Sequence, residues 1–336
     1  VVMPALIAWL TVFLTLTLPL FGPLALGGIF AVIVYASFGV MHRADALARA
    51  LGEPFGTIIL TLSIVIIEVA MVASVLLGPG DHSSIARDTA ISSAMLILNV
   101  ILGLAIIVGA LRHGPLRVRR WALMQYLVTL AGLGSLSFIF PLIFHDDGAL
   151  RGVEAAIIGV AVLGLYATFM RRQLGARSAD FAEAKPAPRS HEPVGANVAW
   201  LVATLTPIVF LSHAMSPLLD AVVPSTAIAG LILAAVALLP ETLTTLRAGW
   251  NGQTQRVSNL THGALVSVFG ASIPSVLVLG GLMDQTITLG GNASELGLLA
   301  ATLLLQSTAL ACGRLTILHG AGHLLIFAAY ALALVS

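Results

Sequence analysis

The sequence predicts an all-α integral membrane protein with eleven transmembrane helices. Three observations support this fold class: 58% of the 336 residues are hydrophobic, only 9% are charged, and the mean hydropathy is +1.02. A soluble domain of average composition carries about 25% charged residues, and one core cannot hide this much apolar surface from water. The apolar runs are roughly 20 residues long, which suits membrane helices and is about twice the length of a barrel strand.

Charged residues and Pro or Gly breaks divide the chain into two series of apolar runs. The first series predicts spans at 3–20, 22–41, 54–78, 89–111, 121–144 and 152–170. The second predicts spans at 196–216, 221–249, 260–283, 293–312 and 316–335. Between them lies one long polar stretch, residues 171–195, which is expected to be an exposed linker because it is rich in charge, Ala and Pro.

The domain layout follows from these spans. We expect a first helix over residues 1–21, a five-helix unit over 22–170, a cytoplasmic linker over 171–195 and a second five-helix unit over 196–336. Because five is odd, two repeated units would enter the membrane from opposite sides. This inverted repeat is the arrangement of many secondary transporters. The first span has no basic segment before it, so it is expected to be retained and not cleaved as a signal peptide.

Lys and Arg are distributed unequally between alternate loops. Of the 16 basic residues, only Arg87 and Arg151 lie in one set of loops. By the positive-inside rule the other set is cytoplasmic, which predicts a multi-pass protein of the bacterial inner (plasma) membrane with its N-terminus inside and its C-terminus outside. With 15 acidic residues the formal net charge is +1, so the chain lacks the basic surface that nucleic acid requires.

Two acidic residues lie inside predicted spans, each in the second span of its five-helix unit. They are Glu68 and Glu241. A charged side chain at the middle of a bilayer costs about 2.5 to 3.5 kcal/mol on insertion scales, so it is normally retained for an ion, a proton or a partner. Inversion would bring both to the midplane, where we expect them to be paired ligands for a cation or a proton. The alternative is a structural role for protonated, hydrogen-bonded carboxyls.

Further polar residues lie on the same predicted helices as Glu68 and Glu241. Glu68 shares one helix face with three residues that are expected to line a cation pathway from the cytoplasmic end, namely Glu53, Thr57 and Thr61. Thr245 lies one turn after Glu241 and is expected on the same pathway, and Pro240 is expected to free a backbone carbonyl. Capping or solvation is the alternative for Glu53, and interhelical hydrogen bonding is the alternative for the threonines.

The spans after each glutamate helix supply weaker ligand candidates. The sequence offers Asn99, Asn259, Ser92 and Ser267 as secondary metal ligands. Helix packing is the alternative explanation, especially for the serines, because small polar residues permit close helix approach.

The histidines and the single cysteine give no enzyme signature. His319 and His323 are one turn apart in HGAGH, but no acid completes an HExxH motif, so hydrogen bonding at the helix start near the cytoplasmic face is the better explanation. His213 and His262 are expected to be loop, interface or proton-relay residues. One cysteine cannot form an intrachain disulfide, and neither a P-loop nor a catalytic triad is recognisable, so we expect no enzyme and no cofactor.

Several motifs resemble the cation/calcium exchanger superfamily, most closely its bacterial ChaA-type calcium/proton antiporters. LGEPFGTIILTLSIVIIE (51–68) resembles the first alpha-repeat. Its glycines and glutamates keep the spacing of that repeat, namely Gly52, Glu53, Gly56 and Glu68. Ile64 and Val65 stand where the general pattern has Gly-Asn. The second repeat is matched by LLPETLTTLRAG and the following NLTHGALVSVFGASIPSV, although His262 replaces an apolar residue, and the C-terminal HGAGHLLIFAAYALALV is also similar.

The resemblance implies an antiporter that exchanges cytoplasmic calcium for external protons by alternating access, with Glu68 and Glu241 as paired ligands. Calcium prefers six to eight oxygen ligands, which two carboxylates and neighbouring neutral oxygens can supply. Sodium or potassium/proton exchange by the same fold is the alternative, because such a site does not exclude monovalent ions. The expected partners are therefore calcium, protons and the lipid bilayer, with a passive channel as a further class that would pass calcium without countermoving protons.

Overall fold

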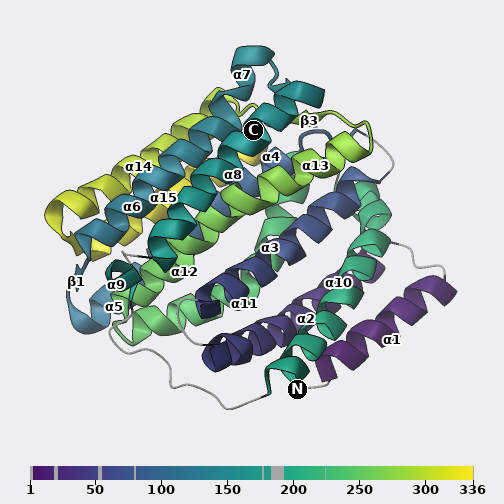
Figure 1. Ribbon diagram of the computed structural model, residues 1–336, viewed down its shortest axis with the longest axis horizontal. Helices are drawn as coiled ribbons and strands as arrows, with labels where there is room; N and C mark the ends of the chain where they lie inside the picture. Colours follow the sequence, from purple (N-terminus) through teal and green to yellow (C-terminus); the bar gives the residue numbers. More distant parts are fainter. Residues whose placement is uncertain are drawn as a thin grey trace. The chain divides into compact units, whose positions relative to one another are not determined.

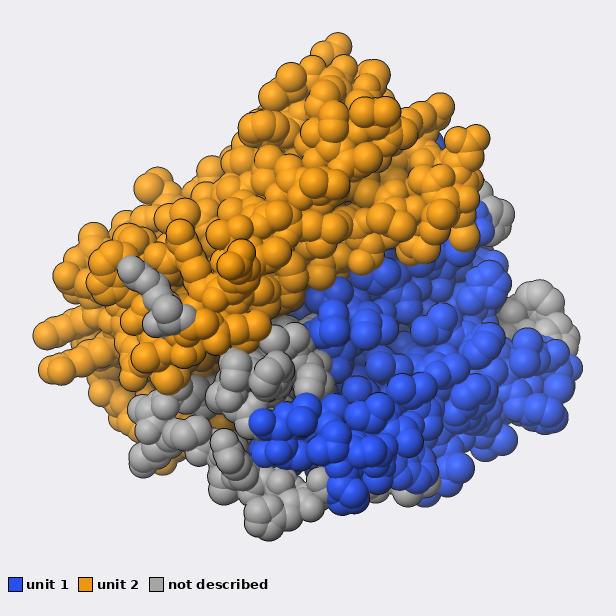
Figure 2. Space-filling model, viewed as in Figure 1, with its two compact units in different colours: residues 1–85, 187–240 blue, residues 86–186, 241–336 orange. Residues whose placement is uncertain are grey.

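The computed structural model describes residues 3–18, 22–51, 55–78, 81–175, 178–182, 193–223 and 225–335, except for the side chains of 48, 55–61 and 64. These residues are almost entirely helical (Figure 1). The chain forms two compact units, coloured separately in Figure 2. Unit 1 comprises Val1–Ile85 and Ala187–Pro240, and unit 2 comprises Ala86–Pro186 and Glu241–Ser336. Each unit therefore combines segments from both halves of the sequence.

Unit 1 is built from four helices and the beginning of a fifth. Their bounds are α1 Met3–Thr17, α2 Gly22–Leu51, α3 Phe55–Leu76, α10 Val194–Val222 and, as far as Pro240, α11 Thr226–Trp250. Helix α10 packs against α1, α2 and α3. At Gly39 in α2 the helices approach closely, because a Cβ there would lie 2.7 Å from Pro4 of α1 and 3.3 Å from Thr204 of α10.

Unit 2 contains the remaining helices, three of which are interrupted by π-helical segments (η). The bounds are α4 Ile85–Met95, η1 Leu96–Ile101, α5 Leu102–His113, α6 Arg120–Gly134, η2 Ser135–Ile139, α7 Pro141–Phe144, α8 Gly152–Leu174, α9 Ser178–Phe181, α12 Thr254–Ser267, η3 Val268–Ser272, α13 Ile273–Leu282, α14 Ala293–Cys312 and α15 Ile317–Val335. Single π-helical turns inside α-helices are frequently found at functional sites. Helix α15 packs on α5 and η1, and α13 packs on α8.

Two short antiparallel strand pairs close the ends of unit 2. Strand β1 (Leu116–Arg117) pairs with β4 (Arg314–Leu315), and β2 (Ala149–Leu150) pairs with β3 (Ile287–Thr288). Because the helical stretch from α6 to α7 begins just after β1 and ends just before β2, the two pairs lie at opposite ends of the unit. Each pair joins a connection in the first half of the chain to one in the second.

The helices confirm a multi-pass membrane protein. In the described part of the chain, nine helical stretches are long and apolar enough to cross a membrane. Two shorter apolar helices, Met3–Thr17 and Val65–Leu76, add to them. Helix α2 continues to Leu51, beyond the expected end at residue 41, because Arg43 has partners on α10: its Nη1 donates to Oδ1 of Asn197 at 3.0 Å, and its guanidinium lies over the Trp200 ring.

Part of the expected exposed linker is packed against unit 2, which corrects that expectation. Helix α8 extends to Leu174, and α9 follows it. Phe181 of α9 is only 6% exposed and contacts the rings of Tyr126 and Phe169. Its carbonyl accepts a hydrogen bond from Nδ2 of Asn259 at 2.8 Å. The linker composition concealed this contact, because one aromatic residue among polar neighbours does not reveal which surface it covers.

Candidate ion-binding site

Glu68 lies in α3 of unit 1 and is buried, with 3% of its surface exposed. A carboxyl buried inside an apolar helix is normally retained for an ion, a proton or a partner. The proposed pathway on the same helix cannot be followed further. Glu53, and the side chains of Thr57 and Thr61, lie outside the described residues.

Glu241 lies in α11 and is the first residue of that helix to belong to unit 2. It is 4% exposed, and Thr245, one turn later, is fully buried. Within the described part of the chain, the Thr245 hydroxyl has no hydrogen-bond partner. A buried hydroxyl of this kind needs water or a cation, since an unsatisfied polar group costs about 1 to 3 kcal/mol. Pro240 lies inside α11, and the helix continues past it to Trp250.

The helices that follow the two glutamates break into π-helix at matching places. Segment η1 begins 28 residues after Glu68, and η3 begins 27 residues after Glu241. The strands continue the correspondence, because β1 begins 48 residues after Glu68 and β3 begins 46 residues after Glu241. Both halves of the chain thus present the same order of elements after the acid.

The four secondary candidates have protein partners within unit 2. Ser92 Oγ lies 2.7 Å from the Tyr330 hydroxyl, and Ser267 Oγ donates to the carbonyl of Gly263 at 3.1 Å. Asn259 accepts from Gln255 at 2.8 Å and donates to the α9 carbonyl described above. These contacts supply partners for the polar atoms that a cation would otherwise use.

Asn99 in η1 is similarly occupied at both ends of its carboxamide. Its Nδ2 donates to Oγ1 of Thr302 at 2.9 Å and points at Sδ of Met95 at 3.4 Å. Its Oδ1 lies 2.8 Å from Nδ1 of His323. The face of α4 and η1 that carries Ser92 and Asn99 is therefore turned towards α14 and α15.

The histidines separate into different environments. Nδ1 of His319 accepts from the Oγ1 hydroxyl of Thr316 at 2.9 Å, which confirms hydrogen bonding at the start of α15. His323 differs from that expectation, because it is fully buried between Asn99 and Gln306. His213 is exposed on α10 and does not lie in a loop. No group of three or more His, Cys, Asp or Glu side chains in the described ranges is arranged to hold a metal.

The connection from α3 to α4 is held to the end of α10 and the start of α11 by polar contacts. Nε2 of His82 lies 3.3 Å from Oδ2 of Asp220. The Ser84 hydroxyl donates to that of Thr226 at 3.2 Å. In the same connection the backbone N–H of Ser83 donates to Asp81, which lowers the pKa of this carboxyl below its ordinary value.

Sequence comparisons identify related proteins over most of the chain. The family model described as sodium/calcium exchanger protein matches residues 21–175. The putative ionic transporter y4hA of Sinorhizobium fredii (strain NBRC 101917 / NGR234) is 31% identical over 312 residues, covering 88% of this chain and 84% of that protein. The sodium-potassium/proton antiporter ChaA of Escherichia coli (strain K12) is 28% identical over 314 residues, covering 89% and 85%.

Solved structures share the fold at low sequence identity. The H+/Ca2+ exchanger CAX aligns with a TM-score of 0.74 and 14% identity over 98% of this chain and 86% of that one. Native YfkE aligns with a TM-score of 0.72 and 14% identity over 99% and 96%. These likenesses establish a common fold.

Proposed function

The chain belongs to the cation/calcium exchanger superfamily of antiporters, and on this premise we propose that it exchanges cytoplasmic calcium for external protons at a site shared by Glu68 and Glu241. The observation that carries the proposal is the burial of one carboxyl in each half of the chain, each followed by a π-helical break at nearly the same distance. The relatives are named as transporters or antiporters, and none is named as an enzyme.

The order of elements supports two inverted five-helix repeats after a first helix, eleven spans in all. In both halves a glutamate-bearing helix is followed by a π-broken helix, a two-residue strand, a helix, a second strand and a last helix. In this order β1 of the first half corresponds to β3 of the second, and β2 corresponds to β4. The pair β1–β4 therefore corresponds to the pair β3–β2, which also forms. Repeats of this kind place their substrate site at the repeat interface near the bilayer midplane.

Competition between protons and calcium accounts for the exchange. Burial raises the cost of a charged carboxylate, and a bound cation lowers that cost, so each glutamate favours either a proton or a shared cation. When the site faces the proton-rich side, protons displace calcium; when it faces the cytoplasm, the carboxyls lose their protons and bind calcium. Thr245 supplies a further oxygen one turn from Glu241. Alternating access between these two states links the two fluxes without a nucleotide or a cofactor.

The charge distribution supports a cytoplasmic N-terminus. The end of unit 2 that carries the β1–β4 pair holds a cluster of exposed arginines: Arg117, Arg119, Arg120 and Arg314. At the opposite end, Arg151 lies beside the β2–β3 pair. By the positive-inside rule the β1–β4 end faces the cytoplasm.

Sodium or potassium/proton exchange is the second candidate. It is favoured by the Escherichia coli relative, whose name gives both ions and which is twice as similar in sequence as the calcium/proton exchangers of known structure. A site of two carboxylates with neutral oxygens accepts monovalent ions as well as calcium. The two candidates share the glutamate pair and differ only in the cation.

Proteoliposomes loaded at acidic pH distinguish these cases. We expect external calcium to release internal protons from vesicles that contain the native protein, and Glu68→Gln and Glu241→Gln to abolish this release, because an amide cannot exchange a proton for a cation. Glu154→Gln, which removes an acid from the loop end of α8, is the matched control and should transport normally. Proton release by sodium or potassium but not by calcium would replace calcium with the second candidate, and full activity of either glutamine variant would refute the paired site.

A further inference from the structure

Four buried polar side chains of unit 2 form a hydrogen-bonded chain, to which neither Glu68 nor Glu241 belongs. It links Thr302, Asn99 and His323 through the contacts given above, and it continues from Nε2 of His323 to Nε2 of Gln306 at 3.0 Å. Thr302 and Asn99 are fully buried, and Gln306 is 1% exposed. A buried polar network is favourable only when each of its members is satisfied.

The hydrogen bonds of this chain have a direction. Nδ2 of Asn99 donates to Thr302, so Oδ1 of Asn99 faces His323 as an acceptor, and Nδ1 of His323 must carry the proton. Nε2 of His323 is then an acceptor and takes an N–H from Gln306. The carboxamide of Gln306 is left with Oε1, which can only accept a hydrogen bond. The chain therefore ends, on the Gln306 side, in an acceptor that faces His262.

His262 can donate to this oxygen through Nε2 only when its ring is protonated. Nδ1 of His262 lies 3.1 Å from the carbonyl oxygen of Ser258, so it carries a hydrogen and Nε2 of the neutral ring is an acceptor. In the described part of the chain Nε2 has no hydrogen bond of ordinary geometry, although Gln306 is close enough to become its partner. A proton on Nε2 would be donated to Oε1 of Gln306 and would complete the chain as far as Thr302.

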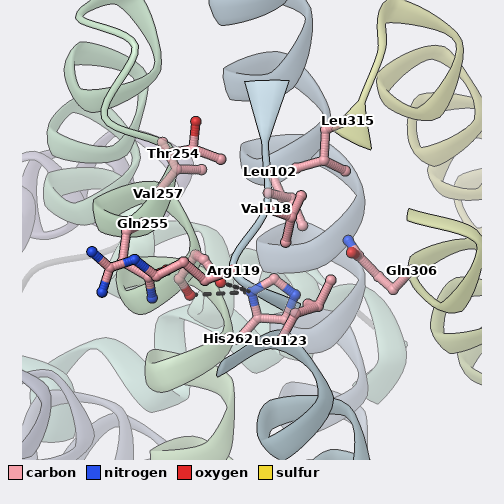
Figure 3. Close-up of a pocket in the computed structure, with 11 residues that line it drawn as sticks. Leu102, Val118, Arg119, Leu123, Thr254, Gln255, Val257, His262, Gln306 and Leu315 are labelled. Atoms are coloured by element: carbon pink, nitrogen blue, oxygen red, sulfur yellow. Dashed lines mark hydrogen bonds between the residues drawn. The ribbon is translucent and has the colours of Figure 1, made fainter. Parts of the chain in front are cut away.

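A narrow cavity leads to His262 from the β1–β4 end of unit 2 (Figure 3). Among its lining residues Arg119 is exposed and Gln255 and Ser258 are half-buried, whereas His262 and Gln306 are buried and so line its inner part. The cavity has room for about one water molecule. His262 is 2% exposed, so the cavity is the route by which water can reach it.

We propose that this cavity admits a proton from the cytoplasmic end to Nε2 of His262, and that the chain from Gln306 to Asn99 holds it as a second protonatable site. The step transfers one proton from a hydronium ion to the ring nitrogen and leaves water behind; release is the reverse. Since Asn99 belongs to η1, cytoplasmic pH acts through this chain on the π-helical segment. The link to transport rests on the proposed function, whereas protonation of His262 does not.

The charged and titratable groups around His262 are few in the described part of the chain. Tyr126 of α6 stacks on its ring at a centroid distance of 5.5 Å, and His323 of α15 lies beyond Gln306. Arg119, at the exposed mouth of the cavity, is the nearby cation. No carboxylate lines the cavity, so a proton that enters it has His262 as its acceptor.

Hydrogen–deuterium exchange at the C2 carbon of histidine, read by mass spectrometry of the full-length protein in detergent, tests the site without a variant. This exchange needs water at the ring and follows its protonation. We expect His262 to exchange with a single sigmoidal pH dependence and His323, which does not line the cavity, to exchange more slowly. The absence of exchange at His262 at every pH would overturn the proposal, because the ring would then be dry and permanently neutral.

Substitutions distinguish a proton site at His262 from a merely structural role of this residue. Gln306→Leu removes the acceptor and should abolish the pH dependence of exchange at His262, whereas Ser307→Ala, on the exposed face of the same helix, should preserve it. In proteoliposomes, His262→Gln should still exchange calcium for protons, but its rate should depend less steeply on cytoplasmic pH than that of the native protein, because only the glutamates then compete for protons. A native pH profile in His262→Gln would refute the link to transport. If the native protein moves no cation, the proposed function fails while the exchange result at His262 stands.

Discussion

Asn99 on η1 and His323 on α15 are joined by a 2.8 Å hydrogen bond although 224 residues separate them in the sequence. Both side chains are fully buried, and each has a second polar partner on α14: Thr302 for Asn99 and Gln306 for His323. This contact fixes α15 against the π-helical segment. It also determines the orientation of the Asn99 carboxamide, and so which atom donates in each hydrogen bond from Thr302 to Gln306.

His323→Leu should therefore destabilise the protein. The substitution leaves Oδ1 of Asn99 and the N–H of Gln306 without the partner they have now, at a cost of about 1 to 3 kcal/mol for each unsatisfied group. Thermal unfolding in detergent measures the loss. Ser307→Ala, on the exposed face of α14, is the control and should change stability by less than about 0.5 kcal/mol. Equal stability of the two variants would show that the hydrogen bonds are replaced by water.

Gly320→Ala should also destabilise unit 2, through crowding. A Cβ at Gly320 would lie 2.7 Å from the carbonyl oxygen of Gly103 and 2.6 Å from Cγ1 of Ile107, so α15 must move away from α5. Overpacking of this kind costs about 1 to 3 kcal/mol. Gly297→Ala in α14 is the matched control, because its Cβ would meet nothing within 4 Å. Unfolding of both variants should show a loss for Gly320→Ala alone.

Thr245→Val should weaken cation binding with little effect on stability. The hydroxyl has no partner in the described part of the chain, so its removal deletes no protein contact, but a cation or its water loses one oxygen. We expect the KM for calcium to rise about 3- to 10-fold. Thr129→Val, which removes a hydroxyl bonded to its own helix, should leave KM unchanged. A fall in stability with an unchanged KM would assign Thr245 a structural role.

Cys312 provides a direct test of orientation. It is the only cysteine in the chain, it is exposed, and it ends α14 next to β4 at the arginine-rich end of unit 2. A membrane-impermeant maleimide should label it in inverted vesicles and not in intact spheroplasts. In a Cys312→Ser background, a cysteine introduced by Asp146→Cys at the opposite end should show the reverse pattern. Labelling of Cys312 from outside would invert the proposed topology.

Hydropathy and charge predicted the membrane helices and the burial of both glutamates, because these properties depend on residues that are neighbours in the sequence. Other features depend on which helices meet. The 3.6-residue period places Ser92 and Asn99 on one face, but it cannot indicate that this face turns to α14 and α15. The same limit applies to His323, which was assigned to a helix start, and to Phe181, which was assigned to an exposed linker.

The π-helical segments are a further feature that the sequence did not reveal. Segment η1 contains apolar residues and Asn99, and η3 contains apolar and small residues including Gly270; neither contains a proline, although Pro274 follows η3 closely. A π-helical turn is stabilised by its surroundings, and those surroundings come from α14 and α15 for η1 and from α8 for η3. The positions of the two glutamates indicate a repeat in the sequence. The matching π-helical segments and strands are visible only in the fold.

The strand pairs also constrain how the protein is made. Leu116 pairs with Leu315, so the turn after α5 must wait until the chain as far as Leu315 has left the ribosome before its backbone groups find their partners. Until translation reaches Arg314, one end of the bundle stays open to the membrane interface. A stalled or truncated nascent chain should therefore be held by the insertion machinery or degraded, since most of its spans are present while the last backbone link is missing.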